Sequence, residues 1–83
     1  MYLSKITVTL RKSILDPQGK AVEQGIHSLG YDAVRNVRIG KFIEISVDAA
    51  NRQEAERLTN DVCQKLLANQ VMEDYSFIVE ERK

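Results

Sequence analysis

The side chains best suited to catalysis or metal binding are one histidine, one cysteine and one pair of adjacent carboxylates. His27 lies off the apolar stripe of a predicted helix, and no nucleophile and base can be paired around it. Cys63 falls at the edge of a second helical stripe, where a cysteine usually acts as a small buried hydrophobe. Glu73 and Asp74 are neighbours on an extended segment, so their side chains point apart. These residues therefore predict no catalytic site.

The residue types argue against metal, phosphate and RNA binding. One histidine and one cysteine supply too few ligands for a metal centre, including that of a metal chaperone. The Gly40-Lys41 dipeptide is not part of a phosphate-binding loop of the G-x-x-x-x-G-K-S/T type. An RNA-binding sheet needs aromatic side chains on its central strands, where this sequence places Thr7, Thr9 and Glu44. We therefore expect the chain to bind no cofactor of its own.

Length and composition indicate one small domain covering residues 1–83. The 12 basic and 12 acidic residues balance, so no net field attracts nucleic acid or an anionic membrane. No apolar run reaches the roughly 20 residues of a membrane span, and the first residues lack the layout of a signal peptide. We predict a cytoplasmic protein. A chain this short buries only about 60–65% of its unfolded surface, which favours an oligomer.

Period-two and helical patterns alternate along the first half of the chain. Residues 2–12 place Ile6, Val8 and Leu10 on one side, which predicts a strand with one buried face. A helix is predicted from Pro17 to Leu29, with Asp16 as its N-cap. Gly30 follows the last apolar residue, as expected of a glycine just beyond a helix.

The second half begins with the stretch Val34–Val47, which we interpret as a β-hairpin turning at Gly40-Lys41. Asn51 then caps a helix that is predicted to continue to about Ala68. Asn69 is expected to end this helix in the left-handed conformation. A last strand covers residues 75–79.

The resulting order, β-α-β-β-α-β, predicts an α+β fold of the ferredoxin-like type. Right-handed crossovers place both helices on one face of a four-stranded antiparallel sheet with strand order 4-1-3-2. No helix remains for the other face, which we call the open face. Its predicted members are Thr7, Thr9, Phe42, Glu44, Ser46 and Ile78. Isolated large apolar residues on a mixed face suit a protein–protein contact, although they also occur scattered on ordinary surfaces.

Three motifs occur in this order along the sequence: L-D-P-Q-G, then V-R-I-G-K, then C-Q-K-L-L-A-N. With their surroundings they make up the segments Leu15–Val22, Leu29–Tyr31, Val37–Glu44, Cys63–Asn69 and Met72–Tyr75. Together these segments resemble one family, the PurS small subunits of phosphoribosylformylglycinamidine synthase. The resemblance extends from Thr7 to Val79. One departure is Gln70, where members of the family often have proline.

The resemblance implies a non-catalytic accessory subunit of a C–N ligase in purine biosynthesis. The whole enzyme uses ATP, magnesium and glutamine to convert formylglycinamide ribonucleotide to formylglycinamidine ribonucleotide. The implied partners are a large ATP-dependent synthetase subunit, a glutaminase subunit and further copies of the chain, as a dimer or tetramer. The small subunit would help the other two dock and would support ammonia transfer between them.

Two contact hypotheses follow. In the first, Phe42 and Ile78 on the open face mediate self-association. In the second, Arg38 and Lys41, with the loops 15–19 and 69–74, meet the larger subunits, although capping alone explains Asp16 and Pro17.

Two other readings use the same element order. An ACT-like module binds a small ligand between paired domains, but its Gly-rich turn after the first strand is replaced here by Ser13–Pro17. A free-standing enzyme of the dimeric ferredoxin-like kind would need a histidine or an acidic pair on the open face, and none is predicted there.

Overall fold

A three-stranded antiparallel sheet forms the centre of the computed structural model, which describes residues 1–82. The strand β1 (Tyr2–Leu10) lies between β2 (Gly40–Val47) and β3 (Glu73–Glu81). Ile6 of β1 stands opposite Ile43 of β2 and Phe77 of β3. This register places the alternating apolar residues of all three strands on one face, as their period of two predicts.

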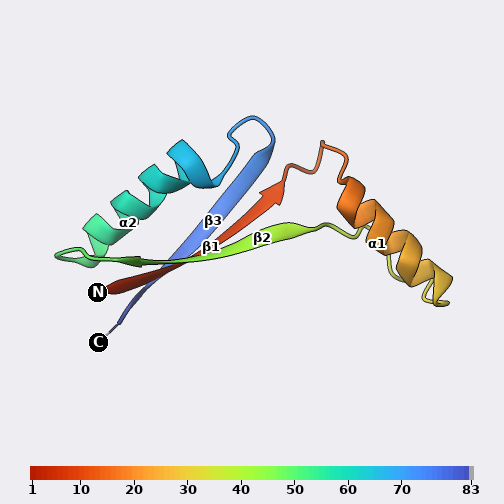
Figure 1. Cartoon of the computed structure of the whole chain (residues 1–83), viewed down its shortest axis with the longest axis horizontal. Helices are drawn as coiled ribbons and strands as arrows, with labels where there is room; N and C mark the ends of the chain where they lie inside the picture. The colour runs from red at the N-terminus through yellow and green to blue at the C-terminus, as the bar shows by residue number, and fades with distance from the viewer. Residues whose placement is uncertain (83) are drawn as a thin grey trace.

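The helix α2 (Arg52–Val62) and the π-helical turn η1 (Cys63–Leu67) cover that apolar face (Figure 1). Ile6, Val8 and Cys63 are fully buried between sheet and helix. Asn51 caps α2 through its side chain, which accepts from the Glu54 N–H at 2.9 Å. The predicted second helix is thus confirmed, and its last turn is π-helical.

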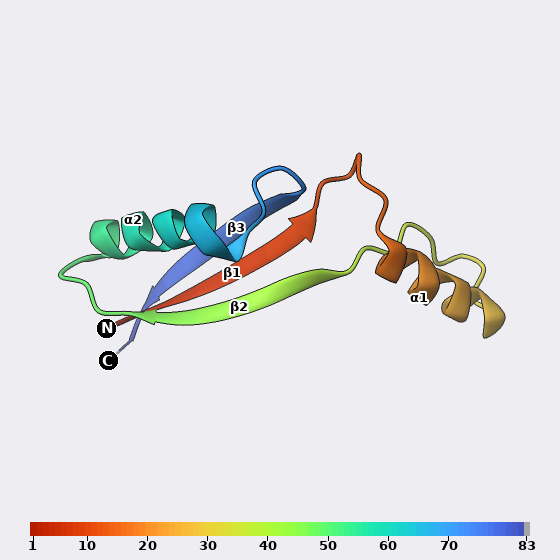
Figure 2. The ribbon, with the colours of Figure 1, turned by 45° about the horizontal axis from the view of Figure 1, so that its top comes forward.

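The helix α1 (Pro17–Ser28) projects away from the sheet instead of covering it (Figures 1 and 2). Its predicted start is confirmed, because the Asp16 side chain accepts from the Gly19 N–H at 2.9 Å and Pro17 occupies the first turn. Gly30 has φ +96°, a conformation that favours glycine and ends the helix. We call residues 11–39, which contain α1, the arm, and the sheet with α2 and η1 the body.

The predicted hairpin turn at Gly40-Lys41 is wrong. These two residues lie inside β2, paired with Thr9 and Val8 of β1. A Cβ built on Gly40 would lie 2.5 Å from the Val8 carbonyl oxygen, so glycine permits a close approach between strands here and does not form a turn. The residues 34–39 form no strand and continue outward from the end of β2 (Figure 2).

The four-stranded sheet with both helices on one face is therefore corrected to three strands covered by one helix. The molecule extends over 51 × 29 × 14 Å. Its Cα radius of gyration is 16.3 Å, whereas a compact domain of this length would have about 12 Å.

Asn69 does not adopt the predicted left-handed conformation, since Asn36 is the one non-glycine residue with positive φ within residues 1–82. Asn69 instead ends the helical segment through its side-chain oxygen. That oxygen accepts from the Val71 N–H at 2.9 Å and from the Met72 N–H at 3.3 Å.

Candidate interaction surfaces

The open face of the sheet carries the residues that its sequence pattern placed there. Thr7 stands between Phe42 and Ser76, and Lys5 stands between Glu44 and Ile78. Phe42 is 63% exposed and Ile78 66% exposed, although both are large and apolar. They flank β1 on opposite sides, so the face presents two separated apolar side chains in a polar setting.

The arm carries a second uncovered apolar surface. Val22, Ile26 and Leu29 share one stripe of α1, and Leu29 is 75% exposed. The sequence predicted that this stripe would pack on the sheet. In the structure Gly19 is the buried residue of α1, and a Cβ on Gly25 would meet nothing within 4 Å. The amphipathic pattern is present, but the chain itself does not cover it.

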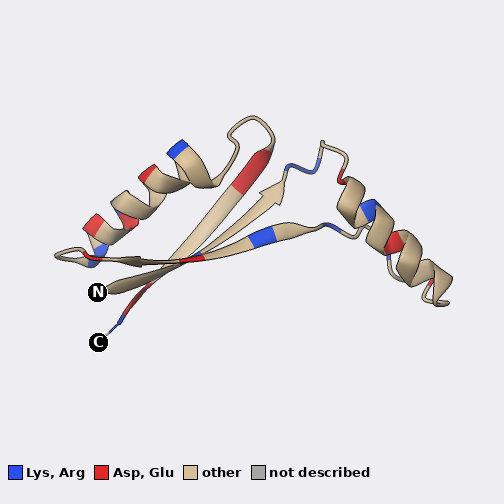
Figure 3. Cartoon of the chain, in the orientation of Figure 1, with Lys and Arg blue, Asp and Glu red and all other residues tan. Residues whose placement is uncertain are grey.

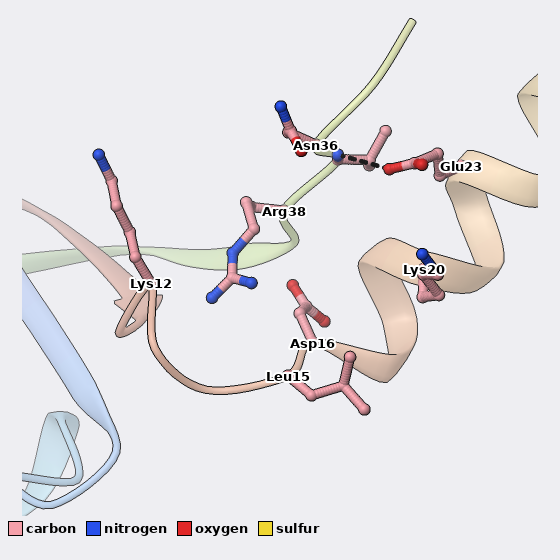
Figure 4. A pocket seen from close by; sticks show the side chains of 8 residues that line it. Lys12, Leu15, Asp16, Lys20, Glu23, Asn36 and Arg38 are labelled. Carbon is pink, nitrogen blue, oxygen red and sulfur yellow. Dashed lines mark hydrogen bonds between the residues drawn. The ribbon is translucent and has the colours of Figure 1, made fainter. Parts of the chain in front are cut away.

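Side-chain carboxylates form hydrogen bonds with backbone N–H groups where the arm leaves the body (Figure 4). Asp16 accepts the Ile39 N–H at 2.7 Å in addition to capping α1, and Glu23 accepts the Val37 N–H at 3.1 Å. The N–H groups of Gly19 and Ile39 hold the pKa of Asp16 below its usual range, and the nearby Arg38 charge acts in the same direction. The N–H of Val37 likewise lowers the pKa of Glu23.

A hollow of about 470 Å³ opens beside these groups. Both carboxylates at this place are engaged by backbone N–H groups. Three of the six other lining residues, Lys12, Lys20 and Arg38, are basic. The lining residues are Lys12, Leu15, Asp16, Lys20, Glu23, Asn36, Val37 and Arg38.

Arg38 and Lys41, predicted to meet larger subunits, both make contacts within the chain. The Arg38 Nη2 atom donates to the carbonyl oxygens of Leu10, Arg11 and Ile14, at 3.3, 2.8 and 3.1 Å. Lys41 Nζ lies 3.5 Å from Glu73 Oε2. Sequence reasoning missed the role of Arg38, because no local pattern shows that residues 10–14 lie beside it.

The residues that the sequence analysis considered for catalysis or metal binding are spread over the molecule. His27 Nε2 lies 2.7 Å from the Val34 carbonyl oxygen on the arm, and Cys63 is buried in the body. Burial raises the pKa of the Cys63 thiol, so the neutral form predominates. Asp74 lies 3.4 Å from Arg11, a contact between two exposed side chains. Within residues 1–82 there is no group of three side chains suited to hold a metal ion.

In the segment 69–74, expected to be a loop, the structure places the last two residues at the start of β3. This segment and the turn before it carry exposed apolar side chains that the sequence analysis did not single out. Val71 is 78% exposed, and Leu66 in the preceding π-helical turn is 79% exposed. Arg11 Nη2 fixes this loop by donating to the Gln70 carbonyl oxygen at 2.6 Å. The loop and the root of the arm therefore lie side by side, which the separation along the chain conceals.

The fold defines a small α+β protein, a three-stranded antiparallel sheet covered on one face by α2, with large apolar side chains left exposed on the arm and the open face. Within the part of the chain that the structure describes, no helix is both long and apolar enough to cross a membrane. A family model described as PurS, phosphoribosylformylglycinamidine (FGAM) synthase, matches residues 3–81. The chain belongs to this PurS family.

Relatives and solved structures agree with that assignment. The PurS subunit of phosphoribosylformylglycinamidine synthase from Bacillus subtilis is 47% identical over 98% of this chain and 95% of its own length. The Methanocaldococcus jannaschii PurS crystal structure superposes with a TM-score of 0.88, at 31% identity and full coverage of both chains. A structure of PurLQS from Thermotoga maritima matches with a TM-score of 0.85, at 28% identity, covering 95% of this chain and 98% of that one.

The ACT-like alternative finds no support in the structure or the comparisons. It rested on the β-α-β-β-α-β order, and the second strand of that order is absent from the described chain. The family match instead extends over nearly the whole chain.

Proposed function

We propose that this chain is an assembly subunit of phosphoribosylformylglycinamidine synthase and has no active site of its own. The single observation that carries the proposal is its similarity to a chain in the PurLQS structure of Thermotoga maritima. The uncovered apolar residues of the arm, the open face and the loop 69–74 support it, since such surfaces suit protein contacts.

In this proposal the partner subunits carry out the catalytic steps. A large subunit binds ATP and magnesium, and a glutaminase subunit releases ammonia from glutamine. The small chain brings the two together in the cytoplasm and supports transfer of ammonia between them. The proposed contacts with these partners are the segments 15–19, which includes the start of α1, and 69–74, which includes the start of β3. Each exposes an apolar side chain near the root of the arm, Leu15 in the first and Val71 in the second.

Reconstitution tests this function. Glutamine-dependent synthase activity is measured with the purified large and glutaminase subunits, with and without this chain. Ammonia-dependent activity of the large subunit serves as the control. We expect glutamine-dependent turnover to require the chain and ammonia-dependent turnover to be unaffected. Equal glutamine-dependent rates with and without the chain would refute the assembly role.

We further infer that copies of the chain associate by exchanging arms. Within residues 1–82, no strand pairs with the outer edge of β2. The residues 34–39 of a second copy can take the place that the sequence assigned to a hairpin strand. Exchange of an identical element between copies is a low-cost route to a dimer. It would complete the expected four-stranded sheet between two molecules.

Space for the second copy's helix exists beside α2. Ile43 and Ile45 of β2 are only partly buried on the covered face. An exchanged α1 would lay its Val22, Ile26 and Leu29 stripe over them, which removes apolar surface from water on both sides. The arrangement places both helices on one face of the sheet, as the sequence pattern predicted for a single chain.

The distribution of charge favours the same arrangement (Figure 3). The arm contains five basic and three acidic residues, whereas the rest of the chain contains seven basic and nine acidic ones. A neutral chain is thus divided into a positive arm and a negative body. The arm of one copy is complementary in charge to the body of the next.

Glutamate substitutions separate the two self-association surfaces. Val22→Glu should block arm exchange and yield monomers in sedimentation, with Gln24→Glu on the opposite side of α1 as the matched control. Phe42→Glu or Ile78→Glu should remove any larger assembly formed through the open face and leave the exchanged dimer. If Val22→Glu and Gln24→Glu sediment alike, arm exchange is wrong. If Phe42→Glu and Ile78→Glu change nothing, the open face is not a contact.

A further inference from the structure

The direction of the arm is set by the two chain segments that join it to the body. The packing contacts that hold the body together join α2 to the three strands, while α1 has at most isolated contacts with another helix or strand. The outgoing segment runs from Arg11 to Asp16, and the returning segment runs from Leu29 to Ile39. The direction of α1 therefore depends on the bonds that join these segments to each other and to the body. The Arg11 N–H, which donates to the Met72 carbonyl oxygen at 2.9 Å, already ties the start of the outgoing segment to the body.

Most of these bonds lie within the arm and move with it. The side chains of Glu23, His27 and Asp16 form hydrogen bonds with the main chain of Val37, Val34 and Ile39, respectively. The returning segment therefore follows α1 along its length. These bonds make the arm a unit. They do not fix its direction relative to β1.

Arg38 is different, because its guanidinium also reaches the body. It contacts Leu10, where β1 ends, and Arg11, the first residue of the arm, whose own N–H is bonded to Met72 in the body. One terminal nitrogen donates to carbonyl oxygens of Leu10, the last residue of β1, and of Arg11 and Ile14. Figure 4 shows the guanidinium directed at the outgoing segment, between Lys12 and Asp16. Hydrogen bonds from a charged donor are stronger than those between neutral groups.

The closed alternative, a hairpin at Gly40-Lys41, is incompatible with these bonds. In that hairpin Arg38 would stand opposite Ile43, which is itself opposite Ile6. It would then lie two strand spacings across the sheet and four residues along it from Leu10, about 17 Å in all. That distance exceeds the length of an arginine side chain, so closing the hairpin breaks the contacts of Arg38 with Leu10 and with Arg11, which follows it.

We propose that Arg38 selects the extended arm over the closed hairpin, and thereby selects arm exchange between copies over a compact monomer. The proposal rests on the self-association proposed above. It assigns to Arg38 a positioning role within the assembly, in place of the direct contact with a larger subunit that the sequence suggested.

The test compares Arg38→Gln with Arg35→Gln in the full chain, by sedimentation and small-angle X-ray scattering. Both variants lose one positive charge from the arm, and within residues 1–82 the Arg35 side chain has no hydrogen bond or ion pair. We expect Arg38→Gln to raise the dissociation constant of the assembly on the order of 10- to 100-fold, as for loss of a charged hydrogen bond. Its monomer should have a radius of gyration near 12 Å. Arg35→Gln should behave as the wild type.

Two results would overturn the role of Arg38: unchanged assembly of Arg38→Gln, or monomers that remain extended. Circular dichroism checks folding, and Arg38→Lys, which keeps the charge but loses the fork of donors, provides a second variant. A partial shift of Arg38→Lys toward compact monomer supports the proposal, and wild-type behaviour contradicts it. A monomeric wild type would refute self-association alone, because comparing the dimensions of the wild-type and Arg38→Gln monomers would still decide the role of Arg38.

Discussion

At the scale of single residues, the body depends on one buried polar pair. Ser4 Oγ and Thr59 Oγ1 lie 2.6 Å apart, and both residues are fully buried. The Thr59 hydroxyl donates to the Ala55 carbonyl oxygen at 2.8 Å, so Ser4 is the donor in the pair. The two hydroxyls fix the distance between β1 and α2, and neither has access to water.

Removing the acceptor should therefore cost more than removing the donor. Thr59→Val leaves the Ser4 hydroxyl buried without a partner, which we expect to lower the free energy of unfolding by about 1–3 kcal/mol. Ser4→Ala leaves Thr59 bonded to Ala55 and should cost less. Urea unfolding of both single variants and the double variant measures the coupling. Equal and additive costs would contradict the assigned donor direction.

A second residue-scale prediction concerns acid stability. Because the folded-state pKa of Asp16 is lowered by the N–H groups of Gly19 and Ile39, its ionised form stabilises the fold. That contribution is present above the ordinary carboxyl pKa of about 3.9 and is lost as the pH falls through the lower, folded-state value. Glu23, held by Val37, contributes in the same direction.

We expect wild-type stability to fall more steeply below about pH 4 than that of Asp16→Asn, which has no carboxyl group to protonate. Urea unfolding at several pH values measures the difference. Parallel pH profiles for the two proteins would show that Asp16 has the same pKa in the folded and unfolded chains.

At the scale of helices and strands, two glycines illustrate opposite constraints. Gly40 lies in β2 with the Val8 carbonyl oxygen 2.5 Å from the position of a Cβ, whereas Gly25 lies in α1 with open space around it. Neither has positive φ in the described chain. Substitution by alanine therefore tests a contact between strands at Gly40 and helix propensity at Gly25.

Gly40→Ala should destabilise the protein by about 1–3 kcal/mol, because the methyl group forces β1 and β2 apart. Gly25→Ala should stabilise it by about 1 kcal/mol through helix propensity. Thermal or urea unfolding of both variants measures the opposite signs. If Gly40→Ala leaves the stability unchanged, β2 can shift to make room for the methyl group. If Gly25→Ala lowers the stability, a partner packs against that side of α1.

At the scale of the whole molecule, the extended shape leaves a positive arm and a negative body exposed in one chain. If the arm of one copy lies on the body of another, part of the association is electrostatic. Raising the salt concentration from about 0.1 M to about 1 M shortens the Debye length from roughly 10 to roughly 3 Å.

We expect that change to raise the dissociation constant of the assembly several-fold, as followed by sedimentation. Apolar burial by the α1 stripe should keep the assembly from dissociating completely. Tighter association at high salt would show that the charge distribution does not contribute and that apolar burial dominates.

The sequence by itself determined the local features of this protein. The period of two in residues 2–10 and 75–79 and in the second half of the predicted hairpin specified which side chains face the core, since strand geometry turns alternation directly into faces. Asp16, Pro17 and Gly30 marked the ends of α1, because capping depends on residues a few positions apart. The apolar surfaces at Phe42, Ile78 and the α1 stripe also follow from periodicity.

Only the tertiary structure decided whether the chain turns at Gly40 or continues through it. Both courses satisfy the same local pattern, so the choice falls to contacts between residues distant in the chain. These are the approach of Gly40 to Val8 and the bonds from Arg38 to the end of β1. Such contacts depend on the path of the whole backbone, and they turned an expected compact sandwich into a body with an extended arm.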